Sequence, residues 1–234
     1  MLRRLGHIPI VRIVAVVLAV GTVTAALVTA ATAVAAQPHI VPQTTKGSPK
    51  GPLVVTIGDS IMAGHGLTPA EAWPALLAVA DEWRVTNLAS DGSGFVAIGD
   101  ERDTFANQVS AAIALHPDVI IVEGSSNDVG VSNTVLEAAT DSTIAHLRQA
   151  LPKATLIGLS AVWGDTAPPS QLADIDDQVD SAVTGNGGYY LNVGQPLGGH
   201  ADLMQSDDVH PTASGQRTLA QAVSEALTAS AIRF

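Results

Sequence analysis

The sequence of 234 residues contains no cysteine. This absence excludes disulfide bonds, thiolate metal sites and catalysis by a thiol, so burial of a core has to stabilise the fold. Aromatic residues make up only 3% of the chain, which disfavours a wide stacking surface for a polysaccharide. The sequence also shows neither a phosphate-binding glycine loop nor a cluster of metal ligands, so we expect no cofactor.

Basic residues are scarce as well, with 11 Lys and Arg against 22 Asp and Glu. The first 36 residues hold three arginines and no acid, so removing them moves the net charge from −11 to −14. A chain with this charge repels nucleic acid and anionic lipid surfaces. We therefore expect neither as a main partner, and we expect a monomer.

Charged residues are absent altogether from residues 13–36, which follow Arg3, Arg4 and Arg12. This run ends in small residues at the spacing that a signal peptidase reads, and it is also long enough to span a bilayer. Residues 1–36 are therefore either a cleaved signal peptide or a retained N-terminal membrane anchor. Both alternatives place the rest of the protein outside the cytoplasm, either secreted or anchored to the outer face of the membrane.

Residues 37–52 contain four prolines and two glycines and show no apolar periodicity, which predicts an extended linker. A single domain follows at residues 53–234, where apolar runs alternate with helix-like segments. The expected strands are residues 53–57, 84–88, 119–122, 155–159 and 189–193. The expected helices are residues 68–80, 104–115, 132–151, 169–183 and 212–229. This alternation predicts a three-layer α/β/α sandwich with a five-stranded, mostly parallel sheet.

The first expected strand leads directly into Gly58, Asp59 and Ser60. Parallel α/β sheets bind their ligands at the carboxyl ends of the strands, which is where Ser60 would lie. If Ser60 opens a helix, its N–H lies among the unpaired donors at the positive end of the helix dipole. A serine hydroxyl is a poor nucleophile until a neighbouring base removes its proton, so the remaining question is whether a base follows.

His210 is the candidate base, because it lies just before the last expected helix with Asp207 three residues earlier. A single turn can aim that carboxylate at the imidazole, which fixes the tautomer and stabilises the imidazolium formed during catalysis. Asp208 is a weaker rival for the same role. Taken alone, the segment also fits a polar loop with a helix-capping acid.

Two further segments offer hydrogen-bond donors after expected strands. Asn127 can donate its side-chain amide to a developing oxyanion, although an Asx turn would also explain it. Gly92 and Gly94 lie in a glycine-rich turn, where a backbone N–H can approach a ligand closely.

In this order and spacing, the segments resemble the SGNH hydrolases, also called the GDSL esterase/lipase family. The resemblance covers nearly the whole domain and implies the fold of that family. The residues that match its four sequence blocks are Gly58-Asp59-Ser60, Asn87 with Gly92, Asn127-Asp128, and Asp207 with His210. The third block departs from the family pattern, because Ser125 stands two residues before the asparagine, where the family has glycine.

The resemblance implies a role for each matching residue. Ser60 would be the nucleophile, His210 the general base and then the acid, and Asp207 its orienting partner. The oxyanion hole would combine the N–H groups of Ser60 and Gly92 with the side-chain amide of Asn127, and Gly94 competes with Gly92. Asp59 would then support the loop and would not be the triad acid.

Three residues are weaker candidates for contact with substrate: Gly94, Trp163 and His65. Trp163 follows a strand end, and His65 lies close behind Ser60. The plainer interpretation makes Trp163 a core or rim residue and His65 a partly exposed loop residue.

The sequence therefore predicts an exported serine esterase. It would hydrolyse an acyl or acetyl ester of a lipid, a sugar or a small molecule through an acyl-enzyme on Ser60. Two alternatives stay open: an O-acyltransferase with a glycan acceptor, and a non-catalytic surface module of the same fold. The presence of Ser60, Asn127, Asp207 and His210 together weighs against the module.

Overall fold

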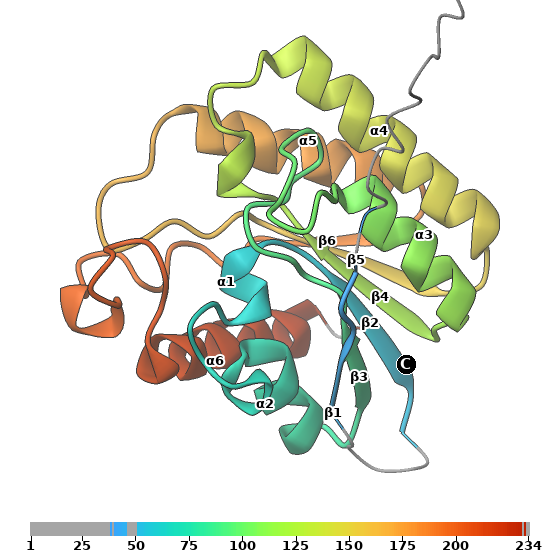
Figure 1. Ribbon diagram of the computed structural model, residues 1–234. Coiled ribbons are helices and arrows are strands. Elements are labelled where there is room, and N and C mark those ends of the chain that lie inside the picture. The colour runs from blue at the N-terminus through green and yellow to red at the C-terminus, as the bar shows by residue number, and fades with distance from the viewer. Residues whose placement is uncertain (1–37, 39, 46–50, 231, 233–234) are drawn as a thin grey trace, which may run out of the picture. The chain divides into compact units, whose positions relative to one another are not determined.

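The computed structural model describes residues 38, 40–45, 51–230 and 232. The predicted export segment, residues 1–36, lies outside these residues. In the described part a six-stranded sheet is covered by helices on both faces (Figure 1), which confirms the predicted α/β class. None of the helices in this part is long and apolar enough to cross a membrane.

The sheet has the strand order β1-β3-β2-β4-β5-β6. Five of these strands run parallel to one another. In chain order they are β2 (Leu53–Ile57), β3 (Arg84–Asn87), β4 (Val119–Glu123), β5 (Thr155–Leu159) and β6 (Tyr189–Leu191). Every residue of the central strand β4 is buried, as expected where helices cover both faces of a parallel sheet.

The sixth strand, β1 (Gln43–Thr45), lies inside the segment predicted to be a linker. It pairs antiparallel with β3, with Gln43 opposite Asn87, and so gives the sheet six strands where we expected five. Its three residues are polar and show no apolar alternation, so no sequence pattern indicates a strand here. The pairing covers backbone groups that β3 would otherwise expose at the edge of the sheet.

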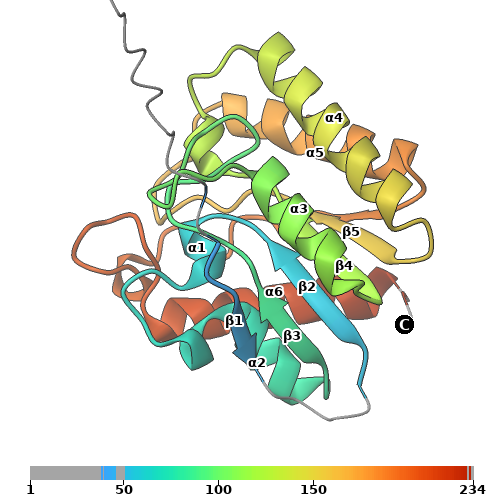
Figure 2. The ribbon, with the colours of Figure 1, turned by 45° about the vertical axis from the view of Figure 1, so that its right-hand side comes forward.

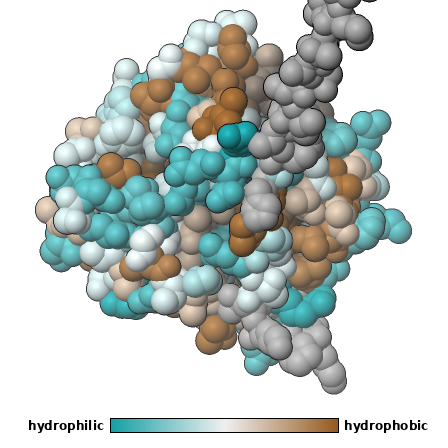
Figure 3. Space-filling model, in the orientation of Figure 1, coloured by the Kyte–Doolittle hydropathy of each residue, from teal (hydrophilic) through white to brown (hydrophobic). Residues whose placement is uncertain are grey.

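Each face of the sheet has its own helices and its own hydrophobic core (Figures 1 and 2). Helices α2 (Trp73–Ala80) and α6 (Ala213–Ser230) cover one face. Helices α3 (Phe105–Leu115), α4 (Asn133–Ala150) and α5 (Gln171–Gly185) cover the other. On the surface seen in Figure 3, hydrophilic regions alternate with hydrophobic patches.

The helix predicted at residues 68–80 is divided in two. A short 3-10 helix, η1 (Pro69–Glu71), begins after Thr68 with the capping box that the sequence indicates. Ala72 is extended, and α2 starts afresh at Trp73. Pro74 explains the break, because it lacks an N–H and its ring would clash with the carbonyl four residues earlier in a continuous helix.

The strand order creates a crevice between the carboxyl ends of β2 and β4. From β2 the chain moves to β3 on one side, whereas from β4 it moves to β5 on the other. Connections that leave in opposite directions open a ligand-binding crevice at such a switch point. Ser60 follows β2 and Asn127 follows β4, so the two predicted site residues flank this crevice.

Candidate active site

The nucleophile candidate Ser60 opens the one-turn helix α1 (Ser60–Ala63), directly after β2. Asp59 is the N-cap, and its carboxylate accepts the N–H of Ile61 at 2.9 Å. Gly64 ends the helix with φ +77°, a left-handed conformation that glycine adopts without steric cost. These two residues hold Ser60 at the turn between strand and helix.

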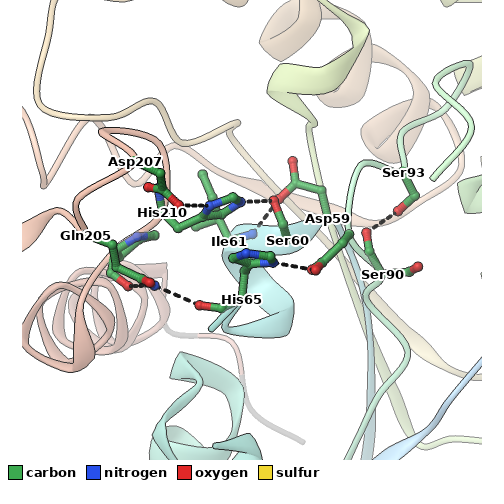
Figure 4. Close-up of polar contacts among 11 residues, drawn as sticks. Asp59, Ser60, Ile61, His65, Ser90, Ser93, Gln205, Asp207 and His210 are labelled. Carbon is green, nitrogen blue, oxygen red and sulfur yellow. Dashed lines mark hydrogen bonds and ion pairs between the residues drawn. The ribbon is translucent and has the colours of Figure 1, made fainter. Parts of the chain in front are cut away.

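Three side chains from two distant parts of the chain form a continuous row of hydrogen bonds (Figure 4). Nε2 of His210 lies 3.0 Å from Oγ of Ser60, and Nδ1 of His210 lies 2.8 Å from Oδ2 of Asp207. The other carboxylate oxygen of Asp207 accepts the backbone N–H groups of Val209 and His210, each at 3.0 Å. The carboxylate therefore fixes both the imidazole ring and the loop that carries it.

These hydrogen bonds also lower the pKa of Asp207. The largest cause is the backbone N–H of His210, followed by its imidazole and by the N–H of Val209. Asp207 therefore stays ionised, as a partner of an imidazolium must. The rival Asp208 adopts a left-handed backbone with φ +58° and lines a separate small cavity beside Trp163.

Three unoccupied hydrogen-bond donors line the cavity in front of Ser60. Among the described residues, the N–H groups of Ser60 and Gly92 donate to no other group. The amide of Asn127 gives one hydrogen to the carbonyl of Ser93 at 3.1 Å, which leaves the second one available. Because all three donors share one cavity with His210, they can bind an oxyanion that forms there.

Gly92 and Gly94 lie in different environments. Gly92 lines the cavity and has φ +75°. The N–H of Gly94 instead donates to the carbonyl of Ala97 at 3.0 Å. A Cβ at position 94 would lie only 2.6 Å from the carboxylate of Asp128, so this glycine permits close packing. The geometry favours Gly92 as the donor.

Asp128 holds the loop that follows Gly92. Its buried carboxylate accepts three consecutive backbone N–H groups, those of Phe95, Val96 and Ala97, at 2.7, 3.0 and 2.8 Å. Asp128 matches a sequence block of the family, but the sequence analysis assigned it no function. Its structural role is to join the loop after β3 to the loop after β4.

Ser125, which departs from the family pattern, connects the loops after β2 and β4. Its hydroxyl lies 2.7 Å from the carboxylate of Asp59 and 2.9 Å from the carbonyl of Ser93. The same oxygen accepts the N–H of Asn127 at 3.1 Å. The serine therefore adds a polar link beneath the site that a glycine could not make.

Asp59 and Glu123 form a buried acidic pair below Ser60. Burial raises the pKa of Asp59 to about 6. Burial and the nearby charge of Asp59 raise the pKa of Glu123 well above its usual range. Within the part of the chain that the structure describes, Oε1 of Glu123 has no hydrogen-bond partner. Asp59 acts as a helix cap and loop support through its bonds to Ile61 and Ser125.

Gln108 is a site-supporting residue that sequence reasoning missed. The side chain is fully buried. Its Oε1 accepts the N–H of Gly58 at 3.0 Å and its Nε2 donates to the carbonyl of Gly58 at 3.1 Å, so Gln108 holds both backbone groups of the residue before Asp59. One signal was present in the sequence. Gln108 shares the buried face of α3 with Phe105, Val109 and Ala112, and a polar residue on such a face needs a partner.

His65 and Trp163 both lie at the site, on different sides of Ile61. The ring of His65 stacks on that of His210 with centroids 4.0 Å apart, and its Nδ1 is bonded to Asp91. A cavity of about 250 Å³ in front of Ser60 includes His65, and one of about 100 Å³ includes Trp163. Ile61 lines both cavities.

One group of possible metal ligands lies at the same place. Ligand atoms of His65, Asp207 and His210 lie within 4.8 Å of one another. Two of these side chains already form the hydrogen-bonded row with Ser60, so an ion bound by all three would compete with that row.

A hydroxyl bonded to an oriented imidazole, beside free oxyanion donors, is the arrangement that acyl-transfer enzymes use. The fold and the site together define a serine hydrolase. The model of the GDSL-like lipase/acylhydrolase family matches residues 56–218, and the chain belongs to this family. It is therefore an esterase, and the predicted family is confirmed.

Several solved structures share the fold. The crystal structure of TesA is 24% identical, with a TM-score of 0.60, over 76% of this chain and 98% of that one. The psychrotrophic esterase EstA from Pseudoalteromonas sp. is 17% identical, with a TM-score of 0.62, over 76% of this chain and 97% of that one. A family two carbohydrate esterase from Cellvibrio japonicus is 16% identical, with a TM-score of 0.62, over 77% of this chain and 62% of that one. A search of the curated proteins finds no match.

Proposed function

We propose that this protein is an exported serine esterase that cleaves a carboxylic ester through an acyl-enzyme on Ser60. The observation that carries the proposal is the row of hydrogen bonds from Asp207 through His210 to Ser60, at 2.8 and 3.0 Å. The free donors around the same cavity support it, because acyl transfer needs both an activated nucleophile and a site for the oxyanion.

Acylation follows from this geometry. Nε2 of His210 removes the proton from Oγ of Ser60 as that oxygen bonds to the ester carbonyl carbon. The carbonyl oxygen becomes an oxyanion and accepts hydrogen bonds from the N–H groups of Ser60 and Gly92 and from the amide of Asn127. His210 then gives its proton to the leaving alcohol, and Ser60 keeps the acyl group.

Deacylation repeats these steps with water. His210 removes a proton from the water, which attacks the acyl carbon, and the proton then returns to Oγ of Ser60 as the acid departs. A glycan hydroxyl in place of water would make the same site an acyltransferase. Product analysis in the presence of an added polyol separates the two reactions.

Export is part of the proposal and rests on the sequence. Arginines near the N-terminus precede an uncharged run at residues 13–36, as in signal peptides and N-terminal anchors. We expect the full chain, produced in a host with a secretory pathway, to leave the cytoplasm. N-terminal sequencing of the product separates the two alternatives, since cleavage near residue 36 indicates secretion and an intact segment indicates an anchor.

The proposed activity is tested with a series of p-nitrophenyl esters from acetate to palmitate. The protein should hydrolyse at least one member, and Ser60→Ala should lose about 10⁴-fold or more in kcat. Ser142→Ala, an exposed serine on α4, is the matched control and should keep full activity. A folded protein that hydrolyses no ester, and whose Ser60 is not labelled by a fluorophosphonate, would contradict the proposal.

A further inference from the structure

A second histidine–aspartate pair lies against the first. His65 follows α1, stacks on the ring of His210 with an interplanar angle of 26°, and bonds through Nδ1 to Asp91 (Figure 4 shows His65 beside His210). Asp91 immediately precedes the oxyanion-hole candidate Gly92. The proposed mechanism of ester cleavage uses neither His65 nor Asp91, so this pair needs its own explanation.

The pair is accessible from the catalytic cavity. The side chains of His65 and Asp91 are 40% and 34% exposed, and both line the cavity of about 250 Å³ in front of Ser60. Among the described residues, Nε2 of His65 has no hydrogen-bond partner. Because Nδ1 is bonded to a carboxylate, it carries the proton in the neutral ring, which makes Nε2 an acceptor.

The pair lies close to His210, the residue that would protonate the leaving alcohol. The leaving oxygen has to come within hydrogen-bond reach of Nε2 of His210, because that nitrogen protonates it. A ring nitrogen of His65 lies within 4.8 Å of a ring nitrogen of His210. Because the two rings also stack with centroids 4.0 Å apart, His65 lies within reach of substituents on the leaving alcohol.

A second, mostly polar cavity adjoins the catalytic one. It has a volume of about 240 Å³ and shares Asp91 and Asp100 with the catalytic cavity. It extends to Ser90 after β3 and to Gln43 on β1. These groups are mostly hydrogen-bond acceptors, which suit an alcohol with several hydroxyl donors. Their carboxylates also repel an anionic alcohol such as a phosphorylated one.

Another cavity, which shares Ile61 and Val209 with the catalytic one, has a different character. The cavity of about 100 Å³ contains Ile61, Val162, Trp163 and Val209, and it has the volume of about three water molecules. An apolar space of this size suits a short acyl chain. The acyl and alcohol parts of an ester can therefore extend into separate cavities.

We propose that His65 and Asp91 form a binding site for a neutral, polyhydroxylated leaving alcohol, and that Nε2 of His65 accepts a hydrogen bond from one of its hydroxyl groups. This inference rests on the proposed function, because it assigns the alcohol side of that same esterase site. His65 and Asp91 then determine specificity and do not take part in the bond-breaking steps.

Two esters with the same acyl group and the same carbon skeleton test this proposal. Glycerol 1-monoacetate carries two free hydroxyls on its three-carbon alcohol, and propyl acetate carries none. Acetate release gives kcat/KM for each ester, and the ratio of the two values is the readout. His65→Phe keeps an aromatic ring against His210 but removes the nitrogen acceptor. Asp91→Asn is the second variant, and His146→Phe, an exposed histidine on α4, is the control.

We expect the wild-type enzyme to favour the glycerol ester. The ratio should fall about five- to tenfold in His65→Phe, the size expected for one lost hydrogen bond, and in the same direction in Asp91→Asn. His146→Phe should leave the ratio at its wild-type value. Equal losses on both esters would show that His65 only supports His210 by stacking, and would overturn the proposal. If the wild-type protein hydrolyses neither ester and no p-nitrophenyl ester from acetate to palmitate, the proposed function itself fails. If it hydrolyses only longer p-nitrophenyl esters, the glycerol and propyl esters of that acyl group replace the acetates in the same comparison.

Discussion

Two aspartates flank Ser60, and their surroundings give them opposite properties. Asp207 lies in a loop with its side chain 42% exposed, and hydrogen bonds lower its pKa. Asp59 is 3% exposed, and burial raises its pKa to about 6. Asp59 is adjacent to Ser60 in the sequence, whereas Asp207 comes from the far end of the domain. Distance along the chain is therefore a poor guide to which acid serves the base.

The same contrast separates the two regions that contain these acids. The imidazole of His210 lies on an exposed loop, which Gln205 ties to the carbonyls of His65 and Pro211 at 2.7 and 2.9 Å. Below Ser60, fully buried polar side chains, Gln108 and Ser125, hold the backbone and Asp59. The exposed region would supply the charge that the reaction needs, and the buried region fixes the positions of the nucleophile and the donors.

The largest expected effect comes from removing the exposed charge. Asp207→Asn should lower kcat about 10⁴-fold with little change in stability, because an amide no longer fixes the required tautomer of His210. Steady-state kinetics on p-nitrophenyl acetate and a thermal melt measure the two quantities. Asp202→Asn, another exposed acid nearby, is the control. A comparable loss in Asp208→Asn, with Asp207→Asn still active, would show that Asp208 and not Asp207 orients His210.

Substitutions in the buried region should lower the stability of the fold instead. Asp128→Ala removes the acceptor of three backbone N–H groups, and we expect the free energy of unfolding to fall by about 3 kcal/mol. Urea denaturation of this variant beside Asp141→Ala, an exposed acid on α4, measures the difference. An Asp128→Ala protein as stable as the wild type would mean that the loop after β3 does not depend on this carboxylate.

Asn127 lies between the two regions and should affect the rate alone. Asn127→Ala should lower kcat about 100-fold and change KM little, because its second amide hydrogen is needed only when the oxyanion forms. Asn127→Asp should lose more, since it places a negative charge next to the oxyanion. An unchanged kcat in Asn127→Ala would remove this residue from the oxyanion hole.

The smallest effect is the pH dependence of stability that Asp59 causes. A carboxyl whose pKa is raised by folding stabilises the fold fully below its unfolded pKa, near 3.8, and this contribution is lost as the pH rises through about 6. The wild type should therefore lose about 2 kcal/mol relative to Asp59→Asn between pH 4 and pH 7. Denaturation curves across this range measure the difference, and parallel curves for the two proteins would contradict the assigned pKa.

Much of this arrangement follows from local features of the sequence. Strands β2 and β5 have the predicted bounds, because runs of apolar residues end at glycine or polar positions. The spacing of Asp207 and His210, together with the family resemblance, predicted their pairing, since a carboxylate three residues before an imidazole can reach its Nδ1 within one turn.

Other features depend on contacts between distant segments and left little trace in the sequence. The edge strand β1 exists because β3 offers it a partner, and its own residues are polar. The bonds of Gln108 to Gly58 and of His65 to Asp91 span 50 and 26 residues. Only the folded chain shows which partners these side chains have.

The labelling rate of Ser60 tests the central comparison most directly, because it reports activation of the nucleophile without any assumption about the substrate. Wild type, Asp207→Asn and Asp59→Asn are mixed with a fluorophosphonate, and intact-protein mass spectrometry follows the modification with time. We expect Asp207→Asn to react at least 100-fold more slowly than the wild type and Asp59→Asn to stay within about fivefold. A slow Asp59→Asn beside a fast Asp207→Asn would show that the buried aspartate, not the exposed one, serves the catalytic base.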